Sequence, residues 1–136
     1  MIQRIQTIWM LLAALAVFLT LKFSFYSGTL IEKNTYDTVI ATDNIILLIL
    51  TSALGTGIII NIFLYKQRSV QIKIAIAALL VEFLIIFMYI REINKFSAGN
   101  FSLWSALHLV IILFLIFAAK GIYNDSKLVK ESNRLR

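Results

Sequence analysis

Residues 76–86 read IAALLVEFLII, ten apolar residues around a single carboxyl group, that of Glu82. This stretch lies inside a long apolar run, and the chain contains four such runs: Ile5–Phe25, Ile45–Tyr65, Ile74–Ile90 and Leu103–Ala119. Thr20, Lys22 and Ser24 interrupt the first run near its end. A helix that crosses a membrane needs about 20 residues, with a range of about 17–25. Because backbone polar groups in lipid must be bonded within their own segment, the four runs predict four transmembrane helices.

The composition also indicates a membrane protein. Of the 136 residues, 60% are hydrophobic and 15% are charged, whereas a soluble domain carries about 45–50% apolar and about 25% charged residues. The absence of cysteine excludes disulfides and thiolate metal sites, and the absence of proline excludes proline kinks. We therefore expect one all-α domain over residues 1–136, a four-helix transmembrane bundle with up-down-up-down topology.

The distribution of basic residues predicts the orientation. In a four-span topology nine Lys and Arg residues lie on the side of the termini and four lie on the other side. The positive-inside rule then places both termini in the cytoplasm, and the opposite orientation is the alternative. The same distribution explains the net charge of +6, so no nucleic-acid partner is expected. A cleaved signal peptide is the alternative for the first run, but cleavage at Ala14–Ala16 would leave a very short apolar region, so we favour an uncleaved span.

Three charged segments carry a resemblance to a known family. They are the opening MIQRIQT (residues 1–7), the basic KQRSVQ (residues 66–71) and the tail pieces KLV (127–129) and RLR (134–136). In this pattern the chain resembles a bacterial family of small four-span inner-membrane proteins that is classed only as a domain of unknown function. The resemblance implies the bacterial inner membrane as the location, and it implies no activity.

The candidate site is a polar layer inside the bundle, made of Thr51, Ser52, Glu82, Ser105 and His108. An ionised carboxylate in the middle of a span costs about 2.5–3.5 kcal/mol on insertion scales, so Glu82 needs a neutral form, a protein-facing position or a partner. From their places in the runs, Glu82 and His108 differ in depth by roughly 4–5 Å, which allows a direct or water-mediated hydrogen bond. We favour a structural hydrogen bond over proton or substrate coupling and over recognition of a partner helix.

Small residues in the second run form two short stripes, Ser52 with Thr56 and Ala53 with Gly57. Small residues let helices approach closely, and we favour packing inside the bundle over formation of a homo-oligomer. Asn61 is expected to cap or bond within the bundle.

The tail, residues 120–136, is expected to be a basic cytoplasmic segment, with Gly121 ending the fourth span and Asp125 or Ser126 capping a new turn. Its cations are candidates for contact with anionic lipid or a partner protein: Lys120, Lys127, Lys130, Arg134 and Arg136. A simple topology anchor is the interpretation that we favour over either contact.

The sequence contains no nucleophile elbow, no phosphate-binding glycine loop and no pair of catalytic carboxylates, and its single histidine with one glutamate gives too few ligands for zinc. We therefore expect an uncharacterised, non-enzymatic membrane protein without cofactors that acts by helix packing or tail contacts with other membrane components. The alternative is a small proton-coupled transporter or ion conduit that uses Glu82.

Overall fold

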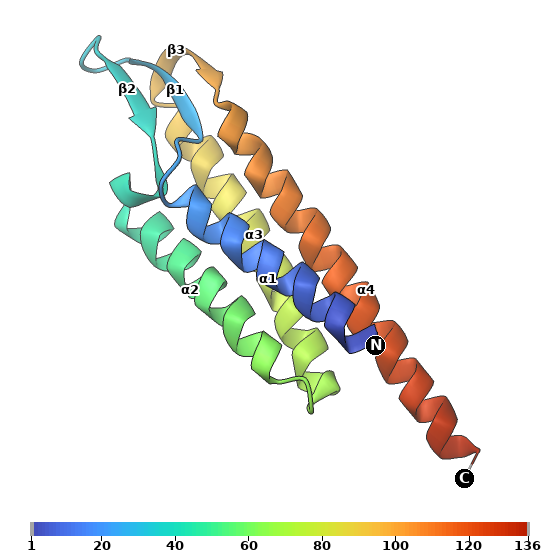
Figure 1. The fold of residues 1–136 in the computed structure, drawn as a ribbon. Coiled ribbons are helices and arrows are strands. Elements are labelled where there is room, and N and C mark those ends of the chain that lie inside the picture. Colours follow the sequence, from blue (N-terminus) through green and yellow to red (C-terminus); the bar gives the residue numbers. More distant parts are fainter. Residues whose placement is uncertain (1, 136) are drawn as a thin grey trace.

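The computed structural model describes residues 2–135, with side chains described from Ile5 onward. Four helices lie side by side, and a small sheet covers one end of them (Figure 1). The helices are α1 (Ile2–Thr20), α2 (Ile45–Phe63), α3 (Arg68–Ile93) and α4 (Ala106–Arg134). The strands are β1 (Tyr26–Leu30), β2 (Tyr36–Val39) and β3 (Phe96–Phe101), and two single 3-10 turns, Ala41–Asp43 and Leu103–Ser105, precede α2 and α4. Helix α1 packs against α2 and α4, and α3 packs against the same two helices.

Within the described residues, three segments are long and apolar enough to cross a membrane by length and composition: α2, α3 and Leu103–Arg134. The apolar part of α1, Ile5–Thr20, is shorter. These three segments agree with the second, third and fourth predicted apolar runs, and their length and composition suggest a membrane protein.

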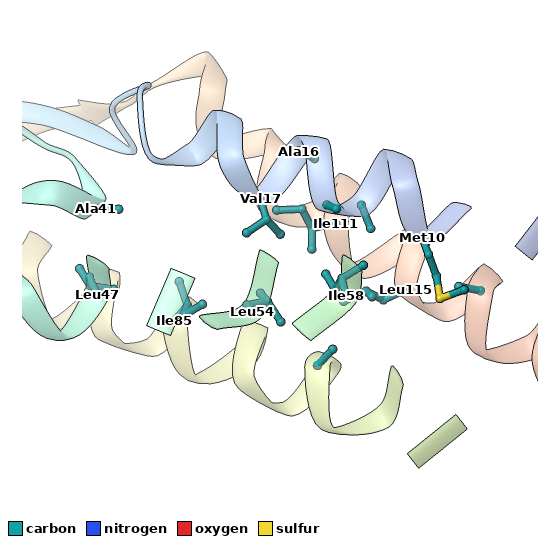
Figure 2. Close-up of a cluster of buried hydrophobic side chains, with 14 of the residues drawn as sticks. Met10, Ala16, Val17, Ala41, Leu47, Leu54, Ile58, Ile85, Ile111 and Leu115 are labelled. Atoms are coloured by element: carbon teal, nitrogen blue, oxygen red, sulfur yellow. The ribbon is translucent and has the colours of Figure 1, made fainter. Parts of the chain in front are cut away.

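The buried residues of α3 and α4 recur every three or four positions, which places them along one face of each helix. In α3 they are Gln71, Ala75, Ala78, Glu82, Ile85 and Tyr89, and in α4 they are His108, Ile111, Leu115, Ala118, Ile122 and Asp125. Figure 2 shows the apolar centre of the bundle, where side chains such as Met10 and Val17 of α1 meet Ile58 of α2 and Leu115 of α4. The outward faces are apolar too, with Leu80 66% exposed and Phe87 58% exposed, which suits lipid rather than water as the surrounding solvent.

The expectation of an all-α chain is wrong in one respect, because two of the polar connections fold into an antiparallel sheet with strand order β2-β1-β3. In its register Gly28 of β1 lies opposite Gly99 of β3. A Cβ atom on Gly28 would lie 2.8 Å from Gly99 Cα, so the two strands approach this closely only because both residues are glycine. The turn between β1 and β2 contains Asn34 at φ 52°, a left-handed conformation that asparagine tolerates.

Three predicted boundaries also need correction. Helix α1 ends at Thr20 rather than near residue 25, and the Thr20 hydroxyl donates to Val17 O at 2.6 Å. Helix α3 begins at Arg68 rather than at Ile74, where the predicted run starts. Helix α4 runs without a break through Gly121 to Arg134, so Gly121 does not end it and neither Asp125 nor Ser126 caps a new turn.

The reason for Gly121 is packing rather than helix termination. A Cβ atom on Gly121 would lie 2.7 Å from Cγ of Gln6, so the glycine lets α1 cross α4 closely. Asp125 is paired with Arg68, and the Ser126 hydroxyl donates to the Tyr123 carbonyl at 2.8 Å within the same helix.

Candidate functional site

The buried carboxyl of α3 and the imidazole of α4 are in direct contact. His108 Nδ1 lies 2.6 Å from Glu82 Oε1, and the residues are only 4% and 1% exposed. Both belong to the buried faces of neighbouring helices, which is why residues 26 positions apart in sequence meet. The contact makes one strong hydrogen bond whether the proton lies on the carboxyl or on the ring.

Aromatic rings enclose this pair on the side of the sheet. The Phe25 and Tyr89 rings stack with centroids 4.4 Å apart and planes at 15°. The His108 ring meets both of them edge-on, with centroid distances of 5.2 Å to Phe25 and 5.1 Å to Tyr89. Phe25 lies just before β1, so the end of the first predicted run reaches the pair as irregular chain and not as helix. The apolar surround strengthens the hydrogen bond between Glu82 and His108 by lowering the local dielectric.

The other residues of the predicted polar layer are placed differently. Thr51 is buried, but its hydroxyl has no hydrogen-bond partner among the described residues. Ser52 is half-buried, and its carbonyl accepts the Thr56 hydroxyl at 2.8 Å. Ser105 is half-buried and precedes the first residue of α4, where its backbone N–H donates to the Ser102 carbonyl. Of the five residues, the structure therefore joins Glu82 and His108 by a hydrogen bond and leaves the other three outside that contact.

A second group of buried polar side chains lies at the opposite end of the bundle, and sequence reasoning anticipated Asn61 in it but missed Gln71. Gln71 of α3 donates from Nε2 to the Asn61 carbonyl of α2 at 3.1 Å, and the Asn61 amide lies 3.6 Å from Met10 Sδ. Asn61 thus bonds within the bundle, as expected. Gln71 lies on the buried face of α3. Its spacing from the apolar residues of that face is the sequence signal that could have predicted a buried glutamine.

Two further contacts complete this inner polar group, which consists of Gln6, Asn61, Arg68, Gln71 and Asp125. Gln6 Nε2 donates to the Gly121 carbonyl at 2.6 Å, and Arg68 Nε lies 2.9 Å from Asp125 Oδ2. Gln6, Arg68 and Gln71 belong to the segments that carry the family resemblance. Those segments are therefore more than topology signals, because their side chains join α1 to α4, α2 to α3 and α3 to α4.

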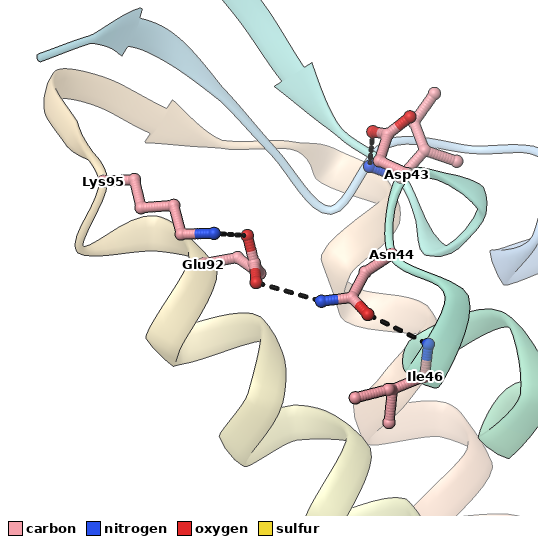
Figure 3. A network of polar contacts seen from close by, with 6 residues as sticks. Asp43, Asn44, Ile46, Glu92 and Lys95 are labelled. Atoms are coloured by element: carbon pink, nitrogen blue, oxygen red, sulfur yellow. Dashed lines mark hydrogen bonds and ion pairs between the residues drawn. The ribbon is translucent and has the colours of Figure 1, made fainter. Parts of the chain in front are cut away.

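Figure 3 shows a third polar group, beneath the sheet. Asn44, the N-cap of α2, donates from Nδ2 to Glu92 Oε1 at 3.1 Å and accepts from the Ile46 N–H at 2.9 Å. Lys95 Nζ lies 2.8 Å from Glu92 Oε2. These bonds join the start of α2 to the end of α3.

The cations of the tail lie on an exposed helix. Lys120, Lys127, Lys130 and Arg134 are exposed and form no ion pair within the described part of the chain. Arg136 lies outside the described residues. Their contact with lipid or a partner stays a prediction.

Within the described residues, no group of three His, Cys, Asp or Glu side chains could hold a metal ion. The fold and the buried pair define a helical membrane protein in which polar contacts join apolar helices. A family model described as Domain of unknown function (DUF4293) matches residues 2–135, and the chain belongs to this family. This agrees with the resemblance in one respect, since a family known only as a domain of unknown function covers nearly the whole chain. Searches of curated proteins and of solved structures give no match.

Proposed function

We propose that the chain is a four-span, non-enzymatic protein of the bacterial inner membrane that contacts other membrane components through its helical tail. The observation that carries this function is the length of α4. The last buried residue of this helix is Asp125, yet the helix continues for nine residues to Arg134. At about 1.5 Å per residue that extension is roughly 14 Å long, and it projects past the other helices at the end opposite the sheet (Figure 1).

Helix length supports the span count, and the distribution of charge supports the orientation. Helix α1 has 19 residues, so it is about 28 Å long, close to the roughly 30 Å of a hydrocarbon core. Lys33 and Lys95 belong to the end with the sheet, whereas most Lys and Arg residues belong to the end with the tail. This asymmetry favours a cytoplasmic tail and a sheet on the outer face.

Because the chain contains no cysteine, a maleimide can label it only at a cysteine that is introduced on purpose. Thr35→Cys probes the exposed turn of the sheet and Ser132→Cys probes the exposed tail. In intact cells an impermeant maleimide is expected to label position 35, and position 132 only after lysis. The reverse pattern would overturn the orientation, and labelling of both positions would overturn the three crossings by α2, α3 and α4 that separate the two probes.

Photo-crosslinking tests the contact function itself. A photoreactive residue at Leu128 probes the tail, and one at Leu113 is the matched control, because the two side chains are 50% and 51% exposed on the same helix. We expect position 128 to form a discrete protein adduct that position 113 does not form. If position 128 forms none, the tail is a topology anchor and the contact function is wrong.

Proton coupling through Glu82 is the second candidate, and the observation that favours it is the short Glu82–His108 hydrogen bond, along which a proton can move. The enclosure of His108 by Phe25 and Tyr89 favours a structural role instead. In proteoliposomes, gradient-driven proton flux that disappears in Glu82→Gln would support coupling. Flux equal to that of protein-free vesicles would count against it.

A further inference from the structure

A basic groove lies beside the inner polar group, where the connection after α2 and the start of α3 face the extension of α4. It has a volume of about 470 Å³. Its cations are Lys66, Arg68 and Lys130, and Ser69 and Ser126 add two hydroxyls. The groove therefore draws on two segments that are about 60 residues apart in sequence, and among the predicted tail cations it includes Lys130.

The charges of this groove are only partly neutralised within the chain. Asp125 meets the Nε of Arg68, which leaves the four N–H groups of the two terminal nitrogens for another acceptor. Lys66 lies over the Tyr65 ring at 5.9 Å, and neither Lys66 nor Lys130 forms an ion pair in the described part of the chain. A planar guanidinium, two ammonium groups and two hydroxyls suit a phosphate oxyanion.

The rest of the lining selects for an amphipathic ligand. Ile72 and Val129 supply apolar walls, and Tyr123 supplies an aromatic ring with a hydroxyl. The groove begins directly after the apolar helix α2, which ends at Phe63, so it lies where a lipid headgroup meets the hydrocarbon core. The N-terminus of α3, at Arg68, adds the partial positive charge of a helix start.

We propose that this groove binds the phosphate headgroup of an anionic phospholipid. The site deepens the proposed function, since it rests on the membrane placement of α2, α3 and α4, but it does not depend on a protein partner for the tail. Lipid bound there would join the α2–α3 connection to α4 and would fix the start of the extension at the membrane surface.

The test compares two double variants that remove the same charge. Lys66→Gln with Lys130→Gln removes two groove cations, and Lys120→Gln with Lys127→Gln removes two exposed cations that do not line the groove. Purified full-length protein in a non-ionic detergent is titrated with phosphatidylglycerol, and bound lipid is counted by native mass spectrometry. At about 1 kcal/mol per basic residue, the loss of two residues is expected to weaken binding about 30-fold. The control variant is expected to change the dissociation constant by about twofold or less, because its charges are farther from the headgroup.

Three results would overturn the proposal. Equal weakening in both variants would mean diffuse attraction to the basic end, and unchanged binding in both would mean that the groove takes no lipid. Inorganic phosphate that competes as well as phosphatidylglycerol does would show a phosphate site without lipid specificity. Phosphatidylcholine, a zwitterion with zero net charge, is the comparison lipid. Thermal unfolding of each variant separates lost binding from lost folding. Cysteine accessibility and crosslinking at position 128 report on the proposed function separately, so either idea can fail alone.

Discussion

The hydrogen bond between Glu82 and His108 should contribute measurably to stability. Glu82→Met and His108→Phe each remove one partner and leave the other buried without it, which costs about 1–3 kcal/mol per variant. Phenylalanine at position 108 keeps a ring edge-on to Phe25 and Tyr89, so the aromatic packing is retained. The double variant removes both polar groups together, and its cost should be smaller than the sum of the single costs.

The difference between the summed single costs and the cost of the double variant is the coupling energy, and its size follows from the geometry of the hydrogen bond. Hydrogen bonds between membrane helices contribute about 0.6 kcal/mol on average and about 1.7 kcal/mol at most. The bond is 2.6 Å long, and the residues are 1% and 4% exposed, so we expect a coupling energy near the upper end, about 1.5 kcal/mol. Glu82→Gln is the conservative control, because its amide can still donate to Nδ1 of His108 and should lose less than Glu82→Met does.

The assay is reversible unfolding in mixed micelles, in which the free energy of unfolding is measured for the unmodified chain, both single variants and the double variant. Sites that do not interact give additive costs to within about 0.3–0.5 kcal/mol. Additivity within that range would refute the conclusion that Glu82 and His108 stabilise each other. A double variant costlier than the sum of the singles would refute it as well.

Two further predictions concern packing and charge. Gly28→Ala should destabilise the protein by about 1–3 kcal/mol because its Cβ would strike the backbone of Gly99. Gly57→Ala is the control, because a Cβ there would meet nothing within 4 Å, and it should be neutral or stabilise α2 by up to about 1 kcal/mol. Equal melting temperatures of the two variants would contradict this prediction. Asp125→Asn should lower the free energy of unfolding by about 1–3 kcal/mol, because the ion pair with Arg68 is lost. The same loss measured in a chain that already carries Arg68→Gln would contradict this prediction.

Sequence patterns located the helices because lipid leaves a chain few options. The apolar runs had to satisfy their own backbone groups, and α2 begins at Ile45, the residue that opened the predicted run. The meeting of Glu82 with His108 could also be anticipated, since two polar residues of similar depth in apolar helices have few other partners. Which residues would share a face with them could not be anticipated, because depth says nothing about helix rotation. Ser52 therefore entered the predicted layer although it lies outside the contact.

The sheet was missed for a different physical reason. Its strands are four to six residues long and include polar or small residues, so neither period-two alternation nor hydrophobicity distinguishes them from loops. They pair because the helices bring two distant connections together, and Gly28 and Gly99 permit the close approach. Local sequence patterns do not carry this information about the pairing of distant strands.

The continuous α4 was missed because Gly121 was interpreted from helix-capping statistics. In the structure the Gly121 carbonyl accepts a hydrogen bond from Gln6 of α1, and the absence of a side chain at Gly121 leaves room for Gln6.

The positions of the polar contacts indicate how the bundle fixes one arrangement. Apolar helices in lipid gain little from hydrophobic association, so many rotations and slides of one helix against another have similar energies. On α3 the buried stripe carries Gln71 near one end and Glu82 eleven residues later, which separates the two by about 16 Å along the helix axis. One bonds to α2 and the other to α4, so a one-turn slide of α3 would break both contacts at once. Two separated polar contacts thus specify both the depth and the rotation of α3, which a single contact could not do. This makes the structural role of Glu82 a sufficient reason for a carboxyl group in the middle of IAALLVEFLII.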